Sequence, residues 1–205
     1  MNISGFIFDL DGTLVDSKLD FDKMRQEMDL APQTSILEAI ENMDPHDANR
    51  CRNILHKHEY EGADKASVMP GVHQFLDQLD GLNIRRAIVT RNARKTAIQM
   101  LNQCRLKFDI VIAREDGPAK PDPWSINHIC RLWNVASKHV VMVGDFHFDI
   151  EAGRSAGAKT VFFTKGKHIV DPMLTSNADL ALRSFEHGRN LLKDLEVALP
   201  TEGIE

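Results

Sequence analysis

Short apolar runs recur along the chain, and each is nearly continuous rather than alternating between apolar and polar residues. Strands that are covered on both faces have this pattern, because neither face of such a strand meets water. The pattern therefore predicts five buried strands, over residues 5–8, 87–89, 110–113, 140–143 and 160–163.

Segments with a helical spacing of apolar residues lie between these runs. In residues 71–81, Val72, Phe75 and Leu79 recur at steps of three and four, so they share one face of a helix. Residues 92–104 and 122–134 have the same spacing. Strands that alternate with helices of this length predict a parallel sheet covered by helices.

The segment between the first and second strands departs from this alternation and contains no convincing strand. Its apolar spacing predicts one helix around Met24 and a second around Ile40. Asp44 followed by Pro45 predicts the start of a third helix, which runs to about residue 65, because an acidic cap and a proline at the first position are typical of helix starts.

These patterns divide the chain into two parts. We predict a core domain from residues 1–17 and 69–205, with a small helical cap inserted at residues 18–68. The pattern weakens after residue 164, where residues 178–182 predict a short edge strand and residues 185–199 a final helix.

The composition excludes several classes of protein. The chain has 205 residues, of which 42% are apolar and 27% charged, and a net charge of −5 gives no reason to expect a nucleic-acid partner. No apolar run is long enough to predict a membrane span, and the N-terminus does not resemble a signal peptide. The cysteines (Cys51, Cys104, Cys130) lie far apart, which favours unpaired thiols and a cytoplasmic protein.

Polar side chains follow four of the predicted strands, at the point where each strand ends. In an open parallel sheet, ligands bind outside the carboxyl ends of the strands. We therefore expect one site that is built from Asp9, Asp11, Thr90, Lys120, Asp145 and Asp149.

These residue types favour a reaction on a phosphate group. The acids offer only oxygen ligands, and a hard cation such as Mg²⁺ prefers oxygen. Asp9 and Asp11 are two residues apart, so on an extended backbone their side chains lean the same way. One carboxylate can then attack phosphorus, while the other protonates the leaving oxygen and later activates water. Thr90 and the backbone N–H groups near Gly12 can hold the oxygens of a tetrahedral anion.

Four motifs in this order resemble the signatures of the haloacid dehalogenase-like hydrolase superfamily. They are FDLDGTL at residues 8–14, Thr90, KPDP at residues 120–123 and GDFHFD at residues 144–149. Within that superfamily the chain resembles the phosphoglycolate-phosphatase-like branch with a small helical cap. The resemblance implies an α/β fold with a doubly wound, Rossmann-like parallel sheet of strand order 3-2-1-4-5, and Mg²⁺-dependent phosphoryl transfer.

The resemblance also implies a role for each residue of the predicted site. Asp9 is the nucleophile and a metal ligand, and Asp11 is the general acid and base whose backbone carbonyl reaches the metal. Thr90 holds the phosphoryl group, and Lys120 stabilises Asp9 and the charge that develops during transfer. Asp145 binds the metal, and Asp149 belongs to the metal group or orients Lys120. The predicted substrate-binding residues are Gly12, Thr13, Arg91 and Asn92, where Arg91 clamps a second anionic group or points to solvent.

The predicted function is a Mg²⁺-dependent phosphatase that hydrolyses a small phosphorylated metabolite through an aspartyl-phosphate intermediate. A sugar-phosphate mutase of the same superfamily and an inactive binding or regulatory module are the alternatives. A dehalogenase is disfavoured, because dehalogenases lack the second aspartate and Asp11 is present. The substrate stays open among phosphoglycolate, sugar phosphates, nucleotide monophosphates and pyrophosphate, and the sequence predicts no oligomeric state.

Overall fold

The structure is a computed structural model that describes residues 3–166 and 177–199. Its centre is a six-stranded sheet in the order β5-β4-β1-β6-β7-β8, in which every neighbouring pair is parallel. This order corresponds to 3-2-1-4-5 with one more strand at the edge, so the predicted fold class is confirmed. The strands are β1 Gly5–Phe8, β4 Arg85–Val89, β5 Ile110–Ile112, β6 Val140–Gly144, β7 Lys159–Phe163 and β8 Leu180–Leu182.

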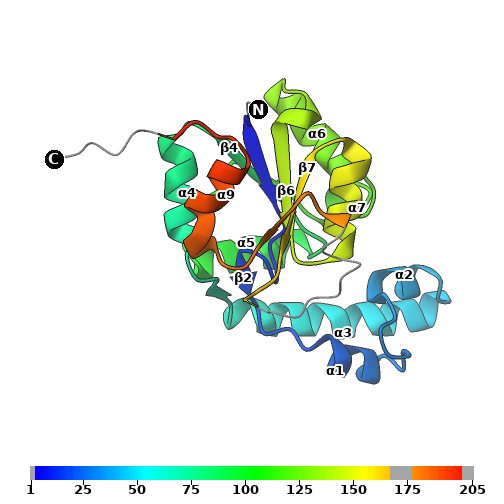
Figure 1. Ribbon diagram of the computed structural model, residues 1–205. Helices are drawn as coiled ribbons and strands as arrows, with labels where there is room; N and C mark the ends of the chain where they lie inside the picture. The colour runs from blue at the N-terminus through cyan, green and yellow to red at the C-terminus, as the bar shows by residue number, and fades with distance from the viewer. Residues whose placement is uncertain (1–2, 167–176, 200–205) are drawn as a thin grey trace.

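Helices cover both faces of the sheet, as Figure 1 shows. One face carries α4 (Val72–Gly81), α5 (Arg94–Gln103) and α9 (Gly188–Asp194). The other face carries α6 (Trp124–Trp133) and α7 (His147–Ala156). A strand between two helical layers has no polar face, which explains the continuous apolar runs in the sequence.

The central strand β1 separates two hydrophobic clusters. Phe6 and Phe8 point to the face with α4 and α5, and Ile7 points to the face with α6, because side chains alternate along a strand. The rings of Phe6 and Phe75 meet edge to face, with centroids 5.6 Å apart. This packing holds β1 rigidly in the middle of the sheet, and the first predicted site residue follows it directly.

The structure corrects three details of the predicted elements. Helix α7 was not among the predicted helices, and the predicted helix at residues 185–199 is a short 3₁₀ turn at Phe185–His187 followed by α9. Two residues of the segment that was predicted to lack strands form β3 (Ser67–Val68), which pairs antiparallel with β2 (Val15–Asp16). This pair joins the two ends of the helical segment where it leaves and re-enters the core.

The predicted helical segment contains α1 (Phe21–Glu27), α2 (Ile36–Glu41) and α3 (Pro45–Asp64). The start of α3 is as predicted, since the Asp44 side chain accepts hydrogen bonds from two backbone N–H groups of the first turn. The three helices pack around a hydrophobic cluster of their own and lie beyond the carboxyl ends of the strands (Figure 1). Among the described residues, no helix is both long and apolar enough to span a membrane.

Candidate active site

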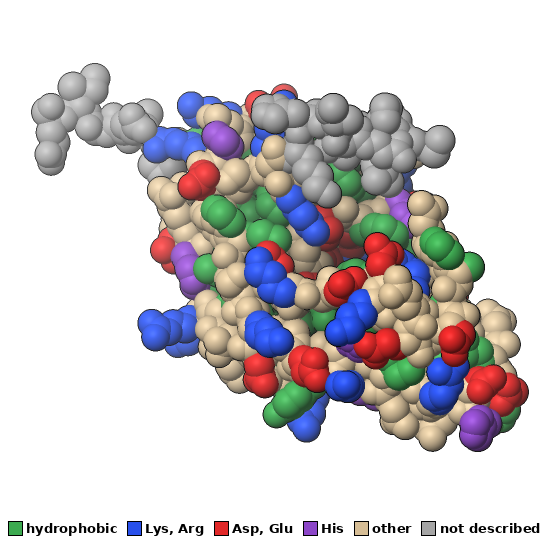
Figure 2. All heavy atoms as spheres, turned by 90° about the horizontal axis from the view of Figure 1, so that it is seen from below, with side chains coloured by type: hydrophobic (Ala, Val, Ile, Leu, Met, Phe, Trp, Pro, Cys, Tyr) green, Lys and Arg blue, Asp and Glu red, His purple; other side chains and the backbone are tan. Residues whose placement is uncertain are grey.

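The site lies where the carboxyl ends of the central strands meet. The backbone N–H of Asp9 donates to the carbonyl of Val143 at 2.9 Å, so the end of β1 is fixed beside the end of β6. Gly12 has a φ of 86°, in the left-handed region, and turns the chain away from the sheet. Seen from this end, the surface is hollowed, with acidic and basic side chains around the hollow (Figure 2).

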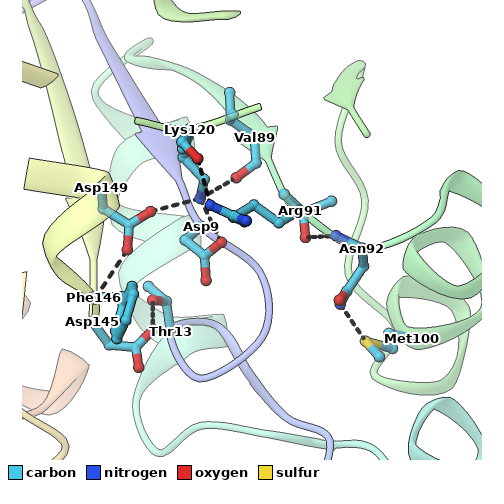
Figure 3. A network of polar contacts seen from close by, with 11 residues as sticks. Asp9, Thr13, Val89, Arg91, Asn92, Met100, Lys120, Asp145, Phe146 and Asp149 are labelled. Atoms are coloured by element: carbon cyan, nitrogen blue, oxygen red, sulfur yellow. Dashed lines mark hydrogen bonds and ion pairs between the residues drawn. The ribbon is translucent and has the colours of Figure 1, made fainter. Parts of the chain in front are cut away.

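Lys120 joins two of the predicted acids. Its Nζ lies 2.6 Å from Asp9 Oδ1 and 2.6 Å from Asp149 Oδ1, and it also donates to the carbonyl of Val89 at 2.8 Å (Figure 3). All three donor positions of the ammonium are therefore used, and its side chain is only 2% exposed. Such a fully bonded, buried lysine holds Asp9 in one orientation.

Burial and the neighbouring opposite charges shift the pKa values of Asp9, Asp149 and Lys120 in opposite directions. Burial raises the pKa of Asp9 to about 8, although the neighbouring Lys120 acts to lower it. Burial also raises the pKa of Asp149. Burial disfavours the charged form of Lys120, but Asp149 and Asp9 outweigh this effect and hold its pKa above the usual range. One lysine does not offset the two buried carboxylates, so the site favours a further cation.

Asp149 is oriented from its own loop. Its Oδ2 accepts from the backbone N–H of Phe146 at 3.0 Å, while its Oδ1 accepts from Lys120. Gly144 makes room for this carboxylate, because a Cβ at that position would lie 2.1 Å from Asp149 Cγ. The glycine of the GDFHFD motif is therefore required by close approach of a side chain.

Asp11 stands somewhat apart from the other acids. Its Oδ1 accepts hydrogen bonds from the hydroxyl of Ser17 and, at 3.3 Å, from the backbone N–H of Ser17. Burial raises the pKa of Asp11 to about 6, against the opposing effect of the Ser17 hydrogen bonds. A carboxyl with this pKa is partly protonated near neutral pH, which a general acid requires.

Asp145 is held by residues from two other loops. The Thr13 hydroxyl donates to its Oδ1 at 3.0 Å, and Lys165 Nζ lies 2.7 Å from its Oδ2. Thr13 is completely buried, and its hydroxyl orients the Asp145 carboxylate. The predicted role of Thr13 in substrate binding stays a prediction.

The residues present fit a divalent cation. Asp9, Asp145 and Asp149 each offer a carboxylate oxygen, and these oxygens lie within 4.8 Å of one another. The predicted fourth member, Asp11, is not part of this group through its side chain, which faces Ser17. Oxygen donors alone suit Mg²⁺, and the acids of the site outnumber Lys120 and Lys165, the two lysines that contact them.

Of the residues that follow β4, Thr90 lies at the strand end, whereas the Asn92 side chain lies against α5. Thr90 is buried, and its hydroxyl oxygen accepts from the backbone N–H of Asn92 at 3.1 Å. The side-chain amide of Asn92 turns away from the acids and lies 3.8 Å from the sulfur of Met100 (Figure 3). The structure thus brings Thr90 to the strand end but directs the Asn92 side chain toward α5, and the predicted contact of Asn92 with substrate stays a prediction.

Arg91 joins the loop after β4 to helix α2. Its Nη1 donates to the carbonyl of Lys120 at 2.7 Å, and its Nη2 lies 2.6 Å from Oε1 of Glu38 on α2. Its guanidinium also stacks on the ring of Phe148, 4.4 Å from the centroid. Arg91 therefore does not point to solvent, and the Glu38 carboxylate already pairs with the guanidinium that was predicted to bind an anionic group.

Comparison with known proteins shows which family has these motifs in this order. A sequence model of the family described as haloacid dehalogenase-like hydrolase matches residues 6–163 of the chain. The chain belongs to this family. The match includes all predicted site residues, and it leaves residues 1–5 and 164–205 unmatched.

Individual relatives match the chain over most of its length, and a solved structure has the same fold. A haloacid dehalogenase-like hydrolase domain-containing protein of Arabidopsis thaliana is 31% identical over 93% of this chain and 84% of its own. A phosphoglycolate phosphatase of Chromobacterium violaceum is 26% identical over 94% of this chain and 98% of its own. Among solved structures, a hydrolase from Pseudomonas syringae has a TM-score of 0.79 at 21% identity, over 94% of this chain and 99% of that chain. The prediction of a hydrolase of this family is thereby confirmed, and the relative named as a phosphatase supports a phosphatase.

Sequence analysis did not assign roles to several residues that the structure brings to the site. Lys165 comes two residues after β7, so the strand-end argument that selected the other residues would also have selected it. Ser17 contacts Asp11 through the turn that follows β1, and Glu38 carries no strand-end signal, because its contact depends on how the helical segment packs on the core. Glu38 is 53 positions from Arg91 along the chain.

Proposed function

We propose that this haloacid dehalogenase-like hydrolase is a Mg²⁺-dependent phosphatase that acts on a small phosphorylated metabolite through an aspartyl-phosphate intermediate. The observation that carries the proposal is the bond between Lys120 and Oδ1 of Asp9. It fixes one oxygen of the carboxylate, and the other oxygen points away from the lysine (Figure 3). A held carboxylate with one free oxygen is suited to attack phosphorus.

The residues of the chain divide the reaction between them. The free oxygen of Asp9 forms a bond to phosphorus as the ester O–P bond breaks, and the leaving oxygen takes the proton of Asp11. Asp11 then accepts a proton from water, which attacks the phosphorus of the aspartyl-phosphate and releases phosphate and the Asp9 carboxylate. Lys120 acts to lower the pKa of Asp9 and so favours its ionised form, and Thr90 donates to the phosphoryl group. When bound, Mg²⁺ offsets the negative charge of the phosphoryl oxygens.

A screen against phosphorylated metabolites tests this function. With Mg²⁺ we expect phosphate release from an aryl phosphate and from at least one metabolite of the panel, and we expect EDTA to stop it, because the acids alone repel an anionic substrate. Phosphate is read colorimetrically and isomers by chromatography. Isomerised sugar phosphate without net phosphate would instead identify a mutase, and neither product would favour an inactive module.

We also propose that residues 18–68 act as a cap over the site. Two ion pairs join this segment to the core beside the catalytic group. Arg91 pairs with Glu38, and Arg114 pairs with both oxygens of buried Glu59, at 2.7 and 3.1 Å. Arg114 also donates to the carbonyl of Arg91 at 3.2 Å, so both contacts converge on the loop that follows Thr90.

The Arg91–Glu38 pair gives a prediction about substrate choice. If Arg91 binds a second anionic group of the substrate, Glu38 competes for the same guanidinium. Glu38→Gln should then raise kcat/KM for phosphoglycolate relative to an aryl phosphate a few-fold. Arg91→Met should lower kcat/KM for phosphoglycolate relative to the aryl phosphate about tenfold or more, because it removes one charge-assisted hydrogen bond to the substrate.

The matched control is Arg86→Met, since Arg86 is about as exposed as Arg91 and pairs with Asp80 at 2.8 Å away from the site. In this control variant, kcat/KM should stay unchanged for both substrates. If Arg91→Met changed kcat/KM equally for the two substrates, Arg91 would not recognise a second anionic group.

A further inference from the structure

Lys165 occupies an unusual place for a lysine in a proposed metal site. It follows β7, and its ammonium lies 2.7 Å from Oδ2 of Asp145, whose other oxygen accepts from the Thr13 hydroxyl. Both oxygens of Asp145 therefore have a partner before any cation is added. Thr13 is neutral and a carboxylate oxygen has more than one lone pair, so the Thr13 contact can persist beside a metal ion. A second positive charge at the same carboxylate is repelled by that ion.

The ammonium lies directly over the loop that carries the catalytic acids. A Cβ at Gly12 would be 2.7 Å from Lys165 Nζ and 2.7 Å from Asp145 Oδ2, so these groups are in close contact above the glycine. The charges of Asp11 and Asp9 act on Lys165 as well. The lysine thus lies in the combined field of the acids that we propose to hold and use Mg²⁺.

The backbone of Lys165 is fixed, whereas its side chain has a route outward. Thr164 N donates to the carbonyl of Leu182 at 2.8 Å, and Gly166 N donates to the carbonyl of Arg183 at 2.9 Å. The Lys165 side chain is 36% exposed, compared with 2% for Lys120. A lysine with a pinned backbone and a partly exposed side chain can leave Asp145 without movement of the sheet, and Lys120 cannot.

We propose that Lys165 is an internal competitor of Mg²⁺ at Asp145: it neutralises this carboxylate in the metal-free protein and is displaced when the cation binds. The inference rests on the proposed function, because it requires the Mg²⁺ site. It makes Lys165 a positioning residue that acts through Asp145 and sets the concentration at which Mg²⁺ loads the enzyme.

Calorimetric titration of Mg²⁺ without substrate tests the proposal. Lys165→Met should bind Mg²⁺ about ten- to a hundredfold more tightly than wild type, because a positive charge near the ion is removed. Lys165→Arg keeps the charge and should stay close to wild type. The matched control is Lys159→Met, at the other end of β7, where the lysine is 40% exposed and pairs with Asp179 at 3.3 Å. It should leave the affinity unchanged.

Melting temperature gives an independent measurement. In EDTA, Lys165→Met should melt below wild type, since its acids lack one counter-charge, and saturating Mg²⁺ should raise its melting temperature by more than that of wild type. Equal or weaker Mg²⁺ binding by Lys165→Met would overturn the competitor role while leaving the metal site intact. Failure of wild type and variant alike to bind Mg²⁺ would overturn the metal site and this role together.

Discussion

Asp9→Asn should abolish turnover, with a loss of at least about 10³-fold in kcat. The amide has nearly the shape of the carboxylate, but its oxygen is a poor nucleophile, so no bond to phosphorus forms. Lys120 fixes Oδ1 of Asp9 at 2.6 Å, whereas Asp145 and Asp149 have partners on both of their carboxylate oxygens. Phosphate release from the best substrate of the panel, at saturating Mg²⁺, measures the effect.

A covalent intermediate distinguishes loss of the nucleophile from loss of structure. After an acid quench during turnover, intact mass should increase by one phosphoryl group in wild type and not in Asp9→Asn. Asp80→Asn serves as the control, since Asp80 pairs with Arg86 and is 50% exposed. It should keep both turnover and the mass increase. Turnover of Asp9→Asn near the wild-type rate would exclude Asp9 as the nucleophile.

The sequence predicted the central strands closely because burial on both faces leaves a strong local pattern. The predicted bounds of the first strand, residues 5–8, are those of β1 in the structure. Helix α7 left a weaker pattern, because the side that packs on the sheet contains the small residues Ala152 and Gly153. A Cβ on Gly153 would lie 2.5 Å from Thr160 Cγ2, so close packing against β7 replaces the large apolar residues that mark other helices.

In the candidate site, too, some contacts follow from a pattern in the sequence and others depend on tertiary packing. Asp9, Lys120 and Asp149 meet as expected, because the topology brings the carboxyl ends of parallel strands, with the segments that follow them, to one edge of the sheet. The partners of the peripheral residues could not be predicted in this way. The orientation of Arg91 depends on Glu38, a residue of helix α2, and the packing of the helical segment on the core is a tertiary contact without a local signal.

Removal of Lys120 should have the second large effect, on stability as well as on activity. Lys120→Met leaves Asp9 and Asp149 buried without their shared cation, and breaking a buried pair in this way costs about 3–5 kcal/mol in the free energy of unfolding. Lys159→Met is the comparison, since its pair with Asp179 is partly exposed and should change stability by less than about 1 kcal/mol. Urea unfolding in EDTA measures both variants.

A double variant separates the two roles of Lys120. Adding Asp149→Asn to Lys120→Met removes one of the two uncompensated carboxylates, so part of the lost stability should return. Turnover should not return, because Asp9 still lacks the ammonium that orients it and favours its ionised form. Loss of such a group costs about 10²–10³-fold in kcat. If Lys120→Met were as stable as wild type, the bridge between Asp9 and Asp149 would not exist in solution. If the double variant recovered activity, Lys120 would serve only to balance Asp149.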